Sequence, residues 1–100
     1  MTVSHAADWV VHKFGGSSVA DAECFRRVAA ILKARSPGRL AVVLSACKGV
    51  TDELIDAVHA AASGADSRAA IAALRARHTR LADELLQPSA VKEFVASLDA

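Results

Sequence analysis

A short apolar run that ends in a lysine and two glycines constrains this chain more than any other feature. Residues 10–19 are Val-Val-His-Lys-Phe-Gly-Gly-Ser-Ser-Val. The apolar run predicts a buried strand, and the residues after Val19 predict a helix, so Lys13, Gly15 and Gly16 fall at a strand-to-helix turn. Ligands of open α/β sheets bind at the carboxyl ends of strands. Glycines admit a phosphate close to the backbone, and a helix N-terminus supplies unpaired N–H donors, so the turn is a candidate phosphate site.

The order of these residues excludes the common P-loop. In that motif the lysine follows the glycines, whereas Lys13 precedes Gly15 and Gly16. Taken alone, the pattern is equally compatible with a tight turn whose exposed lysine binds nothing.

The periodicity of apolar residues predicts a strand, a helix and a second strand in the first half of the chain. We expect these elements at Trp9–Phe14, Ala20–Ala34 and Arg39–Leu44. Ser18 and Asp21 fit a capping box at the start of the helix, and residues 36–38 end it. The second strand is a near-continuous apolar run, which is typical of a parallel strand covered on both faces. The sequence therefore predicts a βαβ unit.

Three further helices are predicted. The first begins near Thr51, the second spans Arg68–Leu86, and the third spans Ser89–Leu98 after an interruption at Pro88. Thr51 is the expected N-cap of the first, whose buried face would be Leu54, Ile55, Val58, Ala61 and Ala62. The second has a stripe formed by Ile71, Leu74, Leu81 and Leu85, on which His78 is expected to be a partly buried packing residue.

Composition places the chain among globular proteins but predicts a thin core. Its 100 residues are 53% hydrophobic, which suits one small domain or part of a larger one. Many of the hydrophobic residues are alanine, which buries little area. Two parallel strands also leave both sheet edges open, so the chain resembles the beginning of a domain.

Charge, apolar runs and cysteines exclude several classes. The net charge is +1, and the densest basic group, Arg75 to Arg80, is expected to be solvated surface, so we expect no nucleic-acid partner. Residues 40–44 are too short a run to span a membrane. Residues 1–8 lack a signal-peptide core and are expected to be a disordered leader, which favours a cytoplasmic location. Cys24 and Cys47 are expected to be free thiols, and the four histidines show no metal-ligand spacing.

Two segments resemble the aspartokinases. Lys13 to Val19 matches the signature Lys-Phe-Gly-Gly-Thr/Ser-Ser-Val, and Leu40 to Asp52 resembles the second strand of that family with its Ser-Ala-x-x-Gly-Val/Ile-Thr-Asn/Asp loop. The combination of His12 with Ser17 is most similar to aspartokinases fused to homoserine dehydrogenase.

The resemblance implies a fold and a reaction. The fold would be the three-layer α/β/α sandwich of the amino acid kinases, of which residues 9–100 would form an incomplete N-terminal portion. The reaction would transfer the γ-phosphoryl group of ATP, with Mg²⁺, to the side-chain carboxylate of L-aspartate. Lys13 would stabilise the transferring group, and Gly15, Gly16 and Ser17 would contact the nucleotide phosphates.

The second loop would hold aspartate. The resemblance implies contacts from Ser45 and Thr51, although Ser45 is equally compatible with a turn residue and Thr51 with a helix cap. Lys48 and Cys47 occupy variable positions of the loop and receive no role.

The resemblance also leaves alternatives. Another amino acid kinase, acting on glutamate, carbamate or a nucleotide, shares the glycine turn, and a truncated non-catalytic binding module would retain it. We expect a homo-oligomer in the full-length protein and NADP only if a dehydrogenase is fused. The chain by itself is expected to be inactive, because other parts of the kinase domain are needed for phosphoryl transfer.

Overall fold

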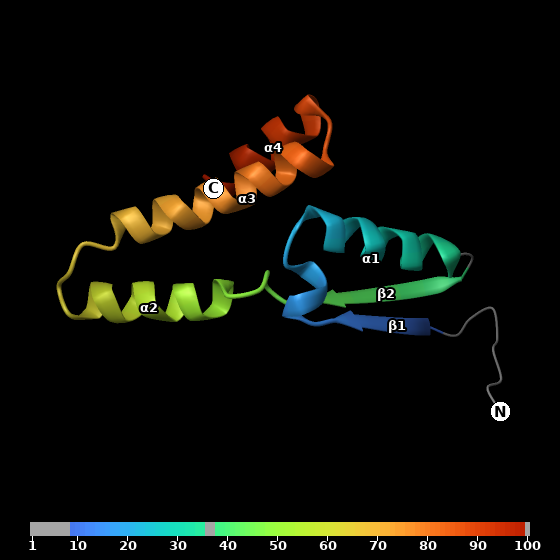
Figure 1. The fold of residues 1–100 in the computed structure, drawn as a ribbon, viewed down its shortest axis with the longest axis horizontal. Coiled ribbons are helices and arrows are strands. Elements are labelled where there is room, and N and C mark those ends of the chain that lie inside the picture. The colour runs from blue at the N-terminus through green and yellow to red at the C-terminus, as the bar shows by residue number, and fades with distance from the viewer. Residues whose placement is uncertain (1–8, 36–37, 100) are drawn as a thin grey trace. The chain divides into compact units, whose positions relative to one another are not determined.

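The computed structural model describes residues 9–35 and 38–99, which divide into two compact units, residues 1–48 and 49–100. The expected disordered leader, residues 1–8, and the expected helix stop at Ser36 and Pro37 lie outside the described residues. Strands and helices are both present, which agrees with an α/β fragment. Figure 1 shows the order of the elements along the chain.

The first unit is the predicted strand–helix–strand arrangement. Its elements are β1 (Trp9–Phe14), the 3₁₀ helix η1 (Gly16–Val19), α1 (Ala22–Ala34) and β2 (Arg39–Leu44). The two strands pair in parallel, from Trp9 opposite Arg39 to Phe14 opposite Leu44. Both strands have the bounds that the sequence predicted, because each is a run of β-branched and other apolar residues between turn residues.

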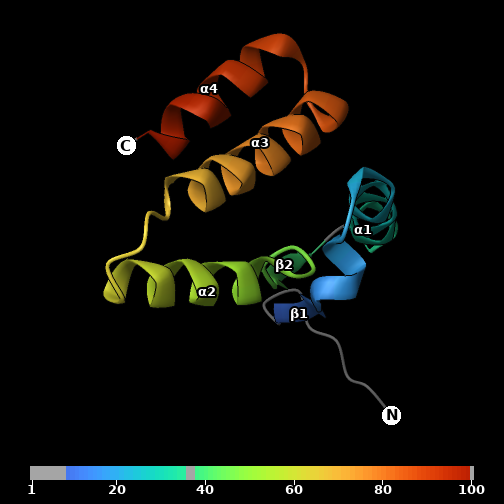
Figure 2. The ribbon, with the colours of Figure 1, turned by 60° about the vertical axis from the view of Figure 1, so that its left-hand side comes forward.

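Helix α1 lies over one face of the two-stranded sheet (Figures 1 and 2). Phe14 lines a cavity together with Val28 and Ile31 of α1, so the even-numbered residues of β1 face this helix. Val28 is buried, and Val19 of η1 is completely buried. Together with Ala22 and Cys47, these two valines form the buried core of the first unit.

The second face of the sheet stays exposed. Trp9 and Val11 are 62% and 64% exposed, and Val43 on β2 is 49% exposed. The Arg39 guanidinium lies over the Trp9 ring, 5.7 Å from its centroid, and is the one described cation–π contact here. The sequence predicted that β2 is covered on both faces. This prediction is wrong for the described residues of the first unit, in which one helix, α1, lies over one face of the sheet.

The start of α1 differs from the prediction. Ser18 does not cap it; its N–H donates to Gly15 O at 3.0 Å and closes the 3₁₀ turn instead. Asp21 is the N-cap, and its carboxylate accepts the Cys24 N–H at 2.9 Å. This bond to the backbone N–H of Cys24 is the main reason why the pKa of Asp21 lies below its ordinary value.

The second unit consists of three helices: α2 (Val50–Ala62), α3 (Arg68–Leu85) and α4 (Pro88–Leu98). Helices α3 and α4 lie side by side in Figures 1 and 2. Pro88 occupies the first turn of α4, where its missing N–H costs nothing, so it starts this helix rather than only interrupting the chain. An ion pair between Arg75 and Asp99 joins the two helices.

The ends of α2 are set by glycines. Gly49, with φ +85°, is its N-cap, so the prediction that Thr51 caps this helix is wrong. At the other end Gly64, with φ +82°, allows Ala65 N–H to reach Ala60 O at 2.9 Å, which is a Schellman closure. Only glycine adopts such a φ without strain.

The predicted buried face of α2 is also wrong. Leu54, Ile55 and Val58 are 46%, 48% and 67% exposed, and Ala57 is buried instead. The apolar stripe exists in the sequence, but the described residues do not cover it. On α3, Leu74 is buried and Ile71 is 50% exposed, while His78 is half-buried as predicted and its Nδ1 lies 2.8 Å from Leu74 O.

We predict that Asp21→Ala lowers the thermal midpoint of helix unfolding by a few degrees, because an N–H of the first turn of α1 loses its acceptor. Asp21→Asn is the control, since asparagine caps as well as aspartate but does not ionise. The lowered pKa means that the ionised carboxyl stabilises the fold fully above its ordinary pKa of 3.8, and that this contribution disappears as the pH falls through the lower folded-state value.

Circular dichroism melts at several pH values measure this effect. The advantage of wild type over Asp21→Ala should shrink in acid, whereas the advantage of Asp21→Asn should not. Equal melting of all three proteins at neutral pH would contradict the capping role.

Candidate functional site

The carboxyl ends of both strands lie at one edge of the sheet. Phe14 and Leu44, the last residues of β1 and β2, are partners in the parallel register. The Ser45 N–H donates to Phe14 O at 3.0 Å, so the pairing extends into the residues that follow β2. The glycine turn after β1 and the loop after β2 therefore leave the sheet next to each other, as expected for ligand-binding loops of an α/β sheet.

Gly15 has room where a side chain would be. Its backbone is extended, with φ −77° and ψ 176°, a conformation that any residue adopts. A Cβ placed on Gly15 would meet nothing within 4 Å among the described residues. Neither backbone strain nor packing in the described residues requires glycine here, so the space beside Gly15 can admit another molecule.

Gly16 lies against the second loop. A Cβ on Gly16 would be 3.5 Å from Ala46 O, 3.6 Å from Lys48 Cα and 3.7 Å from Ser45 Oγ. These are ordinary van der Waals distances for an added methyl group, so the two loops are neighbours with room for about one methyl group between them. The proximity of the two loops is the central geometric feature of the site.

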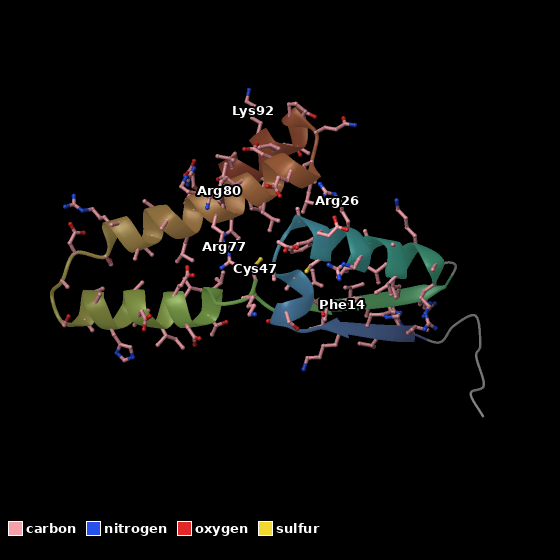
Figure 3. The ribbon with its side chains drawn as sticks, in the orientation of Figure 1. Phe14, Arg26, Cys47, Arg77, Arg80 and Lys92 are labelled. Atoms are coloured by element: carbon pink, nitrogen blue, oxygen red, sulfur yellow. The ribbon has the colours of Figure 1, made fainter. Side chains whose placement is uncertain are left out.

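Lys13 lies on the uncovered face of the sheet. Because side chains alternate along a strand, Lys13 faces away from α1 when Phe14 faces toward it; Figure 3 labels Phe14 at the end of β1. Lys13 is exposed, and its side chain forms no ion pair with any described residue. Its ammonium group is available to an anion at the adjoining turn.

The sequence predicted that the glycine turn leads directly into the N-terminus of a helix, whose unpaired N–H groups would bind a phosphate; this prediction is wrong. Four residues of 3₁₀ helix, Gly16–Val19, follow the turn, and α1 begins only at Ala22 with its first turn capped by Asp21. The N-terminus of α1 is therefore already occupied by a carboxylate. Phosphate binding at this turn would therefore not use the N-terminus of α1.

Ser17 and Ser45 are both exposed beside this edge. The Ser17 carbonyl is the acceptor of a weak bond from Cys24 Sγ at 3.6 Å. The Ser45 hydroxyl donates to Ala46 O at 3.0 Å, which is the bond of a turn residue and leaves its lone pairs accessible. Thr51 is exposed in the first turn of α2, in the second unit, and its contact with a substrate stays a prediction.

A cavity of about 250 Å³ adjoins the turn within the first unit. Its lining combines an apolar floor with polar groups: Phe14, Ser17, Ser18, Cys24, Arg27, Val28 and Ile31. Neither Cys24 nor Arg27 is a site residue predicted from the sequence. The one sequence feature that could have indicated their position beside the cavity is their spacing of three residues, which places Cys24 and Arg27 on the face of α1 that carries Val28.

His12 on β1 is the one described side chain with a buried polar atom that lacks a hydrogen-bond partner, at Nε2. Its ring stacks on Phe14, with centroids 6.2 Å apart and planes inclined by 10°. Both cysteines are free, with Cys24 half-buried and Cys47 buried, in agreement with the prediction.

The described residues hold no group of three or more His, Cys, Asp or Glu side chains that could bind a metal ion. Among the same residues, no helix is both long and apolar enough to cross a membrane.

Comparisons with known proteins agree with this geometry. The Arabidopsis thaliana protein named bifunctional aspartokinase/homoserine dehydrogenase 1, chloroplastic, is 37% identical over 92 residues, which cover 91% of this chain and 10% of that protein. A carrot (Daucus carota) bifunctional aspartokinase/homoserine dehydrogenase is 37% identical over 93 residues, which are 92% of this chain and 10% of its own length. The aspartokinase of Mycolicibacterium smegmatis is 53% identical over 49 residues, 47% of this chain and 12% of its own length.

The chain thus spans about a tenth of the length of the curated relatives it matches. No solved structure shows a significant match to it. The profile of the amino acid kinase family matches residues 8–97, which include both strands and both loops of the candidate site. Because this match covers most of the chain, including the glycine turn and the second loop that lie side by side at one sheet edge, the chain belongs to the amino acid kinase family.

Proposed function

We propose that this chain forms part of the catalytic domain of an aspartate kinase. The reaction would transfer the γ-phosphoryl group of ATP to the side-chain carboxylate of L-aspartate and give 4-phospho-L-aspartate, the first step toward lysine, threonine and methionine. The observation that carries the proposal is the proximity of Gly16 to Ser45 and Lys48, because it would bring a phosphate-binding turn beside a substrate-binding loop. The names of the relatives favour aspartate as the acceptor.

The residues present suit this chemistry. A carboxylate is already an anion, so the acceptor needs no general base, and catalysis consists of positioning and of neutralising charge on the transferring group. Lys13 would supply positive charge, and Ser17 would supply a hydroxyl. The open space at Gly15 would let the phosphoryl oxygens approach the backbone of the turn.

The acceptor would lie over the second loop. Ser45 and Thr51 carry hydroxyl groups that can bond to the carboxylates or the amino group of aspartate. Mg²⁺ in kinases is held largely by substrate phosphates, so this part of the domain would meet the ion through ATP. The ion would neutralise charge on the phosphates when bound.

The whole activity would require more chain than the described residues provide. The adenine site and further contacts to both substrates would come from other parts of a kinase domain, so the 100 residues alone should not make aspartyl phosphate. We further propose a cytoplasmic, homo-oligomeric full-length enzyme, with NADP bound only where a homoserine dehydrogenase is fused. Kinases for glutamate, carbamate or nucleotides, and a non-catalytic binding module, are the alternatives that the experiments below separate.

We predict that Gly15→Ala weakens binding of inorganic tripolyphosphate roughly tenfold, or about 1.4 kcal/mol, because the new methyl group would occupy the space beside the turn. The same substitution should leave stability unchanged or raise it by about 0.4–1 kcal/mol, since alanine adopts this extended backbone and restricts the unfolded chain. Titration calorimetry and thermal melts measure the two effects.

Gly64→Ala is the matched control for that experiment. Because Gly64 has φ +82°, an alanine there is strained and should lower stability while leaving tripolyphosphate affinity unchanged. Undiminished affinity of Gly15→Ala would show that the space beside Gly15 does not hold the phosphates.

A chimera tests the reaction itself. We would replace the corresponding segment of the Mycolicibacterium smegmatis aspartokinase with residues 9–58 of this chain and trap the acyl phosphate with hydroxylamine. We expect ATP-dependent product with aspartate and none with glutamate. Lys13→Ala in the chimera should lower kcat by roughly 10²–10³-fold, the usual loss when a group that stabilises transition-state charge is removed.

Lys33→Ala, which removes an exposed lysine from the last turn of α1, is the control and should retain activity. A folded chimera that phosphorylates glutamate would favour another amino acid kinase. A folded but inactive chimera would favour the binding module.

A further inference from the structure

Lys48 follows the second strand and lies next to the glycine turn. Its Cα is 3.6 Å from the point where a Cβ on Gly16 would be, so the backbone of Lys48 passes close to the turn. A lysine carries its charge at the end of a flexible four-carbon stem. From this position the ammonium group can reach the space over the turn, beside Gly15.

The loop that carries Lys48 is held in place on the strand side. Its first residue, Ser45, is tied to Phe14 O through its N–H at 3.0 Å, and the Ser45 hydroxyl bonds to Ala46 O at 3.0 Å. Cys47 is 8% exposed, whereas the next residue, Lys48, is exposed. The loop backbone is therefore anchored while the Lys48 side chain remains accessible to a ligand.

The net charge of the first unit favours an anionic ligand. Residues 1–48 contain seven Lys and Arg against three Asp and Glu, a formal charge of +4, whereas residues 49–100 contain five against eight, a formal charge of −3. Within the described part of the chain, neither the Lys13 nor the Lys48 side chain forms a hydrogen bond or an ion pair. Two ammonium groups without a partner among the described residues thus lie in the first unit, Lys13 near the end of β1 and Lys48 in the loop after β2.

We propose that Lys48 is a second cationic ligand for the polyphosphate, which it binds together with Lys13 across the glycine turn. This inference rests on the proposed function and adds a residue to that site. Charge in phosphoryl transfer is spread over three equatorial oxygens, and two separate ammonium groups neutralise it more completely than one. Lys48 belongs to the loop that carries Ser45, so it would also draw the phosphoryl group toward the acceptor.

Titration of the 100-residue chain with inorganic tripolyphosphate tests the role of Lys48. Lys48→Gln should weaken binding roughly threefold to fivefold, the scale of an exposed charge pair, and Lys48→Arg should bind like wild type because it keeps the charge. Lys33→Gln removes the same charge from the far end of α1, about 16 Å from its start at 1.5 Å per residue. At 0.15 M salt this separation exceeds the Debye length of about 8 Å, so Lys33→Gln should leave affinity unchanged.

The variants separate the two proposals. Weaker binding by both Lys13→Gln and Lys48→Gln supports the second ligand. A loss confined to Lys13→Gln overturns the role of Lys48 and leaves the phosphate turn intact. If neither substitution weakens binding, or if wild type does not bind tripolyphosphate, the phosphate site of the proposed function fails and the role of Lys48 fails with it.

Kinetics of the chimera provide a second readout. Lys48→Gln should raise the KM for ATP several-fold and leave the KM for aspartate unchanged, because the ligand is the polyphosphate and not the acceptor carboxylate. A rise confined to the KM for aspartate would overturn the proposal. Circular dichroism of the variants in the 100-residue chain confirms that this exposed substitution leaves the fold intact.

Discussion

The parallel register between β1 and β2 is the constraint on which the candidate site depends. Phe14 and Leu44 end their strands opposite each other, and the bond from Ser45 N–H to Phe14 O carries the pairing one residue further. A shift by one residue would turn Lys13 to the face that α1 covers, because side chains alternate. It would also separate Gly16 from Ser45. The register thus determines both the direction of the Lys13 side chain and the proximity of the two loops.

The sheet that has this register is covered by a helix on one face, and its other face is exposed. Parallel sheets are normally packed on both faces, yet Val11 and Val43 remain largely exposed on the face that carries Lys13. The apolar residues of α2, such as Val58, are exposed in the same way. Under the proposed function, the rest of a kinase domain would cover these surfaces. The free energy gained by that burial would also order the site.

Several elements were predictable because local chemistry decides them. The strands follow from apolar runs, and the βαβ order follows from the helical spacing of Phe25, Val28 and Leu32 between them. Helix starts were harder, because more than one polar residue competes to cap them. Ser18 is used by the 3₁₀ turn, so Asp21 caps α1, and Gly49 precedes Thr51 at the start of α2. Both errors arise from glycine or 3₁₀ geometry that side-chain periodicity does not record.

The amino-acid sequence by itself determined the two strands, the glycine turn that follows the first of them, and the family to which the chain belongs. These depend on residue type and spacing along a short segment. Only the tertiary structure decided that Gly16 lies beside the second loop, that the Lys48 backbone passes close to the turn, and which apolar residues are covered. The reason is physical: contacts between segments about 30 residues apart, and the burial of a face, depend on which surfaces meet in space, and periodicity describes each segment alone.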